Sequence, residues 1–496
     1  MLASQVLQLS WLTVAVLTVG VLGLFISCFP LLQTDRRLPK IPGPLLNYFV
    51  GLGISLPPYT LTKFRKWAGE YGDIYRVQVG WHHWVVLNSP EAVKIVFDKQ
   101  VCLLQMPMSD VVVGGMRVPT MSYGPKWRAY QQLCHQILTA KAVNSFIPYQ
   151  TVEIARLLND LATKNTDDSA FYKDINRMLF STLMRAVYGR STESVNDEDL
   201  KYTEQSAKLL SKIQQPGSYI EDMRMWNRLK EQFTSLSAPS CYAKQMIESD
   251  FRQQGLKEED LAWIAGGLVD AGSATSTATF HNLILYLAAF PEVQETAAAE
   301  INRVIGDSRK PAMADIPQLP YVWACIKEVL RICPMPPWAI RHFTDADVVY
   351  KDMVITKGTA VICNTVALHY EPKKYPDPMA FRPEDHINNT KFAGDYAAMS
   401  DPQARNHFTF GVGRRVCPGT RLVESNLALM LANMLWAFDI QPPLNGEKGK
   451  ATIDVSDDAF EPYPLRHAKP FKVRFVPQNE HRLEMVLREG REAQKM

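Results

Sequence analysis

The chain has 496 residues, of which 47% are hydrophobic and 21% are charged, a balance that is ordinary for globular proteins with a large core. Its 54 basic and 51 acidic residues leave a formal net charge of +3, which gives no reason to expect a nucleic-acid partner. The 8 cysteines are scattered without a CxxC pair, so a disulfide framework and a cysteine-rich zinc site are both disfavoured. We expect all of them but one to be small buried hydrophobic residues in a reducing compartment.

The N-terminal segment is predicted to span a membrane once. Trp11 to Leu32 carries no charged residue and matches the roughly 20 apolar residues that cross a bilayer core. No Lys or Arg precedes this segment, whereas Arg36, Arg37 and Lys40 follow it closely. This excess of positive charge after the span places the N-terminus in the lumen and the remaining chain in the cytosol. The alternative interpretation of the segment is a buried core helix.

The rest of the chain is predicted to form one mainly α domain. We divide the sequence into a luminal tip with the transmembrane anchor (1–34), a proline-rich linker (35–44) and one large domain (45–496). Helical periodicity is strong at 261–289, 292–305, 321–332 and 420–438, and strand-like runs occur at 74–79, 84–87, 348–350, 360–363 and 471–475. Long helices with short strands near both ends of the domain indicate a mainly α fold with small β-sheets rather than an alternating βαβ array.

The loop from Phe410 to Gly419 is the most informative stretch. Its sequence, FGVGRRVCPG, surrounds Cys417 with glycines and a proline just before a predicted helix. Glycines permit left-handed turns and a close approach of the backbone to a flat partner. Backbone N–H groups and the positive end of the following helix favour a thiolate, which is the form that an axial iron ligand requires. From the residues alone, a buried structural cysteine in a turn is an equally weighted alternative.

The same loop resembles the haem-binding pattern FxxGxRxCxG of the cytochrome P450 family at every fixed position, namely Phe410, Gly413, Arg415, Cys417 and Gly419. The resemblance implies a cytochrome P450 fold that holds haem b, with Cys417 as the iron ligand. It also implies that Arg415 pairs with a haem propionate, since a guanidinium fork matches a carboxylate, and that Phe410 packs beside the sulfur.

Other landmarks of the family follow in the family's order. Glu328 and Arg331 resemble its ExxR pair, and at i and i+3 of a helix they share a face. The resemblance gives this pair a structural role in holding the loop upstream of the cysteine. Trp127 matches the tryptophan of the family's WxxxR clamp, although Gln131 replaces the arginine of that clamp. Arg341 stands where the family often places a second propionate partner.

A further position of this network is left open. Where the family commonly has Arg or His downstream of the ExxR helix, this chain has Asp385, with His386 one step later and Arg382 upstream. Any of these three side chains could complete the network with Glu328 and Arg331.

The predicted helix at 261–289 contains the sequence AGSATS at 271–276, which resembles the family's A-G-x-[DE]-T-[TS] motif. The resemblance makes Thr275 the catalytic residue that guides protons to bound oxygen, because cleavage of the O–O bond requires protons at the distal oxygen. Back-bonding of its hydroxyl to the preceding turn is the structural alternative. Ala274 replaces the acid of the motif, and Asp270, one turn earlier on the face of Ala274, could stand in only through water.

The positions that the resemblance places toward a substrate are mostly apolar: 111–116, Met335, Pro337, Trp338 and Tyr463. They suggest a hydrophobic substrate of aromatic or terpenoid character, and ordinary core packing explains them equally well.

These features predict a membrane-anchored haem-thiolate monooxygenase that activates O2 with electrons from NADPH-cytochrome P450 reductase, with cytochrome b5 as a further candidate donor. No GxGxxG motif occurs, so the NADPH site is expected on the reductase. The similarity is to fungal microsomal enzymes of secondary metabolism, and it implies the endoplasmic reticulum membrane. The rivals are a haem isomerase or dehydratase that needs neither oxygen nor reductase, and a non-enzymatic haem carrier or gas sensor.

Overall fold

The computed structural model describes residues 18, 20, 41–44, 60–79, 82–99, 102–103, 116–119, 121–164, 169–213, 241–335, 342–444, 451–461 and 466–496. The chain divides into two compact units. The first comprises Met1–Cys102 with Arg341–Cys363, and the second comprises Leu103–Ile340 with Asn364–Met496.

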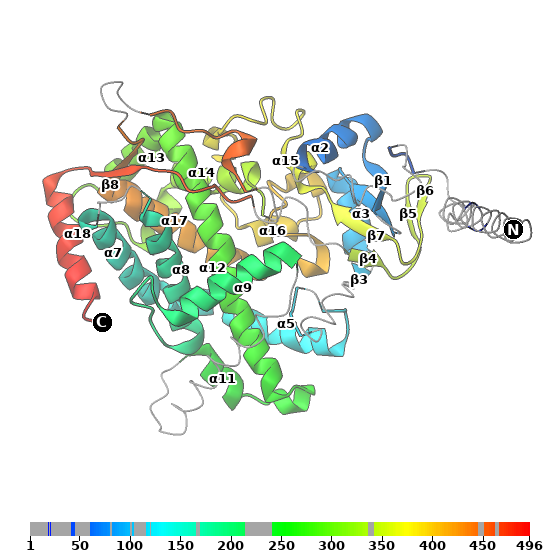
Figure 1. The fold of residues 1–496 in the computed structure, drawn as a ribbon, viewed down its shortest axis with the longest axis horizontal. Coiled ribbons are helices and arrows are strands. Elements are labelled where there is room, and N and C mark those ends of the chain that lie inside the picture. Colours follow the sequence, from blue (N-terminus) through cyan, green and yellow to red (C-terminus); the bar gives the residue numbers. More distant parts are fainter. Residues whose placement is uncertain are drawn as a thin grey trace, which may run out of the picture. The chain divides into compact units, whose positions relative to one another are not determined.

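The first unit is built around a mixed sheet of strand order β1-β2-β7-β4-β3 (Figure 1). Its elements are α2 (Thr60–Tyr71), β1 (Ile74–Val79), β2 (His82–Leu87), α3 (Pro90–Lys99), β3 (Cys102–Leu103), β4 (His342–Thr344), β5 (Val348–Tyr350), β6 (Met353–Ile355) and β7 (Ala360–Cys363). β1 pairs antiparallel with β2, and β2 pairs parallel with β7. Phe64 and Trp67 of α2 pack on Tyr75 and Val77 of β1, because alternate residues of a strand share one face. The strands predicted at 74–79, 84–87, 348–350 and 360–363 are confirmed, although β2 begins two residues earlier.

The predicted linker is described only from Ile41 to Pro44, and this extended piece lies against the first strand of the sheet. Arg76 N–H donates to Pro42 O at 2.8 Å. A Cβ on Gly43 would overlap the carbonyl oxygen of Arg76, so glycine is required for this close approach.

The second unit is mainly helical. Its helices are α5 (Pro125–Ile137), α6 (Ala140–Ser145), α7 (Ile147–Thr163), α8 (Phe171–Tyr188), α9 (Glu198–Ile213), α11 (Tyr242–Glu248), α12 (Glu258–Ala289), α13 (Pro291–Val304), α14 (Pro320–Ile332), α15 (Thr365–His369), α16 (Ala393–Ala397), α17 (Thr420–Ala437) and α18 (Glu480–Ala493), with a two-stranded sheet of β8 (Phe438–Gln441) and β9 (Arg474–Pro477). The long helix α12 packs against α8, α5, α14 and α17 (Figure 1). The four predicted helices are confirmed as α12, α13, α14 and α17, with ends that differ by at most three residues.

The strand predicted at 471–475 lies instead at Arg474–Pro477. Its partner β8 ends at Gln441, opposite Arg474, and Pro442 and Pro443 follow, so the neighbouring chain offers no N–H groups to extend the ladder. Phe471 packs its ring on Phe171 instead, with the ring centroids 5.4 Å apart.

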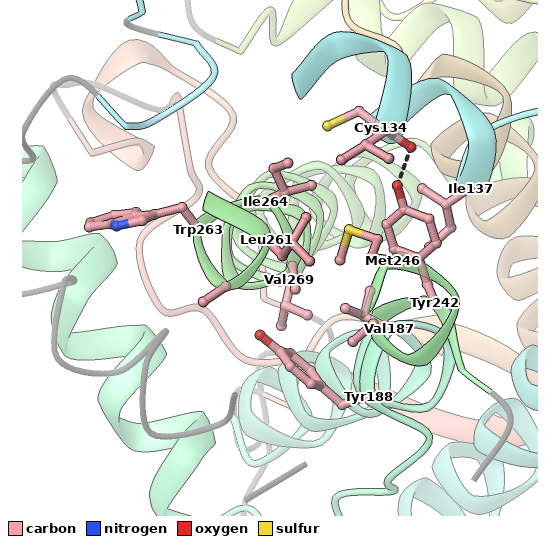
Figure 2. Close-up of a cluster of buried hydrophobic side chains, with 14 of the residues drawn as sticks. Cys134, Ile137, Val187, Tyr188, Tyr242, Met246, Leu261, Trp263, Ile264 and Val269 are labelled. Carbon is pink, nitrogen blue, oxygen red and sulfur yellow. Dashed lines mark hydrogen bonds between the residues drawn. The ribbon is translucent and has the colours of Figure 1, made fainter. Parts of the chain in front are cut away.

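A buried cluster joins α5, α8, α11 and α12 in the second unit (Figure 2). Tyr242 donates its hydroxyl to Leu133 O, and Ile137 and Met246 lie beside the Tyr242 side chain (Figure 2). Each large apolar side chain buried in such a core contributes about 1.5–3 kcal/mol. The same cluster includes residues of the candidate site and therefore fixes where α5 and α12 lie.

The predicted membrane span lies outside the described residues except for Thr18 and Gly20. Within the described part of the chain, no helix combines the length and the apolar character needed to cross a bilayer.

Candidate active site

The loop around Cys417 turns sharply before α17. Gly411 and Gly413 have φ angles of 78° and 60°, which side-chain-bearing residues rarely adopt, and Cys417 N–H donates to Phe410 O at 2.8 Å. The loop thereby places the cysteine directly before the N-terminus of α17. Among the described free cysteines, Cys417 is partly exposed, whereas the others are buried: Cys134, Cys241, Cys325, Cys333 and Cys363.

Two effects act on the pKa of Cys417 in opposite directions. Burial raises the pKa of Cys417, and a hydrogen bond from the backbone N–H of Gly419 lowers it by less. The Gly419 N–H acts in the direction expected of the loop, since it favours the thiolate. A coordinated metal ion would favour the thiolate further.

Arg415 and Trp127 lie together beside this loop. The guanidinium carbon of Arg415 is 3.9 Å from the ring centroid of Trp127, and Nη2 donates to Met121 O at 3.0 Å. Burial lowers the pKa of Arg415 to about 10. Trp127 Nε1 is buried and has no hydrogen-bond partner among the described residues. Among the described residues Arg415 has no carboxylate partner, so its guanidinium and the unpaired indole N–H are donors that fit an anionic group such as a haem propionate.

Two neighbouring polar residues of α5, Gln131 and Arg128, are not part of this pair. Gln131 Nε2 lies 3.1 Å from the exposed His135 ring, and the guanidinium of Arg128 lies over the ring of Tyr123. Neither side chain replaces the arginine that the family's clamp has at position 131. Arg341 lies outside the described residues.

The middle of α12 is open although most of the helix is buried. Ala271 is exposed, and Ala274 and Thr275 are partly exposed. A Cβ on Gly272 would lie 2.9 Å from Leu183 Cδ1, so a larger residue here would require the Leu183 side chain on α8 to shift. Thr275 Oγ1 donates to Ala271 O at 2.7 Å, which is the back-bonding considered as the structural alternative. The small exposed residues leave room for a flat group beside the helix.

Asp270 is ion-paired with Arg117, a partner that the sequence did not reveal. Both side chains are mostly buried, and Arg117 precedes the two carbonyl groups, of Val118 and Met121, that Arg415 contacts. The segment around Arg117 is therefore held on one side by the cysteine loop and on the other by α12. Arg117 and Asp270 lie 153 positions apart, so no local sequence pattern could have paired them.

Glu328 and Arg331 form a buried bidentate pair on α14, with Nε–Oε2 and Nη2–Oε1 distances of 2.7 and 2.8 Å. Arg331 also donates to three carbonyl oxygens of the downstream chain: His369, Pro378 and Ala380. The open position of this network is taken by His386, whose Nε2 lies 2.9 Å from Glu328 Oε2. Asp385 lies 4.0 Å from Arg382 in a contact that is largely exposed. The network therefore ties α14 to the chain that leads to the cysteine loop.

A second buried ion pair connects α14 to α17. Lys327 Nζ contacts Glu424 Oε1, and both side chains are fully buried. Glu424 Oε2 also accepts a hydrogen bond from Ala393 N at 2.8 Å. This pair anchors the helix that follows Cys417, and it was missed because Lys327 resembles an ordinary surface residue next to Glu328.

The proposed substrate-facing positions are only partly described. Met116 packs against the buried cluster, and Met335 is buried, with its sulfur 4.0 Å from Thr279 Oγ1 of α12. The remaining positions lie outside the described residues: 111–115, Pro337, Trp338 and Tyr463.

Comparison with known proteins supports one family. The family model described as "Cytochrome P450" matches residues 41–250 and 228–455. "Cytochrome P450 monooxygenase pgmC" of Aspergillus terreus is 43% identical over 92% of this chain and 89% of its own length. "Cytochrome P450 monooxygenase verL" of Clonostachys rogersoniana is 29% identical over 86% of this chain and 85% of its own length. A zebrafish cytochrome P450 solved with abiraterone has the same fold, with a TM-score of 0.70 and 22% identity over 85% of this chain and 100% of that chain.

The cysteine loop, the buried ExxR network and the small-residue helix thus occur in a chain that matches the family model over most of its length. The chain belongs to the cytochrome P450 monooxygenase family and is an oxidoreductase.

Proposed function

We propose that this protein is a haem-thiolate monooxygenase that takes electrons from an NADPH-dependent reductase and inserts one oxygen atom of O2 into a hydrophobic small molecule. The observation that carries the proposal is the partly exposed Cys417 in its glycine-turned loop, beside the paired Arg415 and Trp127. When bound, haem supplies the activation of oxygen.

The chain's own residues then hold the cofactor. Cys417 would hold the haem iron through its sulfur, and the Gly419 N–H, which donates to that sulfur, would tune the ligand's electron density. Arg415 and the Trp127 N–H would bind a haem propionate, and Arg341 is the residue that we propose for the other propionate. Phe410 shields the sulfur side of the loop, and its ring lies 5.6 Å from that of His407.

Thr275 positions protons for the reaction. Its hydroxyl has one donor and two acceptor sites, and the donor is used by Ala271 O. No donor among the described residues contacts Oγ1, so its lone pairs can hold a proton-bearing water in the groove. Because Ala274 has no acid, water or a substrate hydroxyl must complete the path from solvent.

The curated monooxygenases to which this chain is similar come from fungi. We infer a place in secondary metabolism and an apolar substrate, with Met116 and Met335 among the residues that shape its pocket. Electrons come from NADPH-cytochrome P450 reductase, with cytochrome b5 as an additional donor.

We also infer that Trp11 to Leu32 anchors the protein in the endoplasmic reticulum membrane, with the catalytic domain in the cytosol. A truncated chain that begins at Arg36 should still bind haem and should lose integral membrane association. A truncated chain that expresses well but binds no haem would instead make the segment part of the fold.

The test of the proposed function is the spectrum of the reduced protein with carbon monoxide. The wild type should give the strongly red-shifted band of thiolate ligation, and Cys417→Ser should lose it. Product formation from a panel of lipophilic compounds should require both the reductase with NADPH and oxygen. The second candidate is an isomerase, because Ala274 stands where the family's motif has an acid. Turnover without oxygen would favour that candidate. A Cys417→Ser protein that keeps the band would refute the ligand assignment.

A further inference from the structure

Three arginines surround one buried carboxylate between α7 and α8. Glu153 is fully buried, and Arg156 Nη1, Arg177 Nη1 and Arg185 Nε lie 3.2, 2.9 and 3.2 Å from its oxygens. Arg156 and Arg177 are almost fully buried, and Arg185 keeps a small exposed edge. Arg156 Nε also donates to Ala493 O at the end of α18. None of these residues belongs to the haem site.

The same cluster holds polar atoms without hydrogen-bond partners among the described residues. These atoms are Arg177 Nε, Arg177 Nη2, Arg185 Nη2, Gln150 Nε2, Gln150 Oε1 and Thr192 Oγ1. Gln150 is on the face of α7 that carries Glu153, and Thr192 O accepts from Arg177 Nη1 at 3.1 Å, so these residues adjoin one cluster. Unpaired buried polar groups are few in native proteins, and each calls for a water or an ion.

The unpaired atoms are mostly donors. Guanidinium groups have no acceptor, and the amide and hydroxyl can both donate. A water that accepted from two arginines would bring two hydrogens, and among the described residues the unpaired acceptors for them are Gln150 Oε1 and Thr192 Oγ1. An anion accepts from all the donors and brings no hydrogen.

The charges of the cluster balance. Arg177 Nη2 also lies 3.7 Å from Asp160, and Lys164 contacts both Asp160 and Asp174. The three arginines equal in number the three carboxylates Glu153, Asp160 and Asp174, and the exposed Lys164 and Glu193 offset each other, so the unpaired donors rather than a net charge indicate an anion. Burial lowers the pKa of Arg185, and the positive charge of Arg156 lowers it further. The negative charges of Glu153 and the exposed Glu193 raise it by less.

We propose that this cluster is an internal binding site for one small monovalent anion, with chloride as the physiological occupant. The anion accepts from Arg177 and Arg185 and is reached through the exposed edge of Arg185. The small size follows from the enclosure of the site, because Gln150, Glu153 and Thr192 are completely buried. The site is independent of the haem chemistry and stabilises the packing of α7, α8 and α18.

The direct test is a crystal structure of the haem-loaded full chain in bromide, with data collected at the bromine edge. An anomalous peak within hydrogen-bond distance of Arg177 and Arg185 is expected. Ordered water there, with no bromide signal, would overturn the proposal.

A solution test compares thermal unfolding in a gluconate buffer with thermal unfolding in a chloride buffer of the same ionic strength. Gluconate is too large for the site, whereas chloride fits it. The wild-type Tm should rise by roughly 2–4 °C. Arg185→Met should abolish the rise. The matched control is Arg190→Gln, since Arg190 follows α8 but pairs with Asp197 and Asp199. That control should keep the full chloride dependence. A Tm of the wild type that does not respond to chloride, or an Arg185→Met protein that responds as the wild type does, would contradict the proposal.

Discussion

His386 Nε2 lies 2.9 Å from Glu328 Oε2, and both side chains are completely buried. Asn389 Nδ2 lies 3.0 Å from His386 Nδ1, so an imidazole that accepts there donates its Nε2–H to the carboxylate. Through this bond the turn that contains His386 is fixed to α14, on which the Glu328–Arg331 pair stands.

His386→Ala should therefore destabilise the fold. Loss of one donor to a buried carboxylate costs about 1–3 kcal/mol. The matched control is Asp385→Ala, whose side chain makes only the exposed 4.0 Å contact with Arg382 and should change stability by less than about 0.5 kcal/mol. Urea unfolding of the haem-loaded proteins, with haem content per chain, measures both. Equal midpoints for the two variants would show that His386 does not hold the network.

The Glu328 carboxylate should make the protein sensitive to acid. Burial raises the pKa of Glu328, but the hydrogen bonds and charges of Arg331 and His386 outweigh burial and hold the pKa below its ordinary value. A depressed folded-state pKa gives stability that is present above the unfolded-state pKa of about 4.3 and lost as the pH falls further. Below that pH the wild type should lose stability more steeply than Glu328→Gln. At pH 7 the free energy of unfolding of Glu328→Gln should be lower by about 3–5 kcal/mol, because the arginine loses its charged partner. Unfolding free energies between pH 3 and 7, roughly the span of this titration, provide the measurement. Parallel pH profiles would contradict the assignment.

Haem retention should depend on the stacked pair of Arg415 and Trp127. Arg415→Lys keeps the charge but loses the planar fork, and Trp127→Phe keeps the ring but loses the Nε1–H. Each should speed haem loss to a scavenger protein about 10-fold, since a charge-assisted hydrogen bond contributes about 1.5–3 kcal/mol. Arg128→Lys, on the same helix over Tyr123, is the control and should lose haem at the wild-type rate. Unchanged rates for all three would remove this pair from the cofactor site.

Proton delivery should depend on the Thr275 hydroxyl. A general-acid contribution is typically worth about 10²–10⁴-fold in rate, so its loss should divert NADPH consumption into hydrogen peroxide in Thr275→Ala. Thr275→Ser keeps the hydroxyl and should stay coupled, and Ala274→Asp should change both the coupling and the solvent isotope effect. Product and peroxide per NADPH, measured with the native substrate, distinguish these outcomes. A fully coupled Thr275→Ala protein, with Ala274→Asp like the parent, would show that the groove does not control protonation.

The C-terminal helix α18 should tolerate no side chain at Gly490. A Cβ there would overlap the Asn159 side chain of α7, with Cγ at 2.6 Å. Gly490→Ala should therefore cost about 1–3 kcal/mol by overpacking. Gly69→Ala is the matched control, because a Cβ at Gly69 of α2 meets no atom within 4 Å, and better helix propensity should make it neutral or up to about 1 kcal/mol more stable. Urea midpoints compare the two. A neutral Gly490→Ala variant would mean that α18 shifts freely on α7.

The sequence by itself determined the local features of this protein. The glycines of the cysteine loop, the i, i+3 spacing of Glu328 and Arg331 and the small residues of α12 depend only on backbone geometry within a few positions, so they could be predicted with the residues that form them. The helices α12, α13, α14 and α17 follow from apolar periodicity in the same way.

Only the tertiary structure decided which distant side chains meet. The choice of His386 over Asp385, the pairing of Asp270 with Arg117 and the burial of Lys327 against Glu424 depend on how helices and loops far apart in the sequence pack. The burial that raises the pKa of Cys417 likewise depends on how the rest of the chain packs around the loop. A residue's neighbours along the chain do not specify its desolvation or its long-range partner, and these two quantities set the energy of buried polar groups.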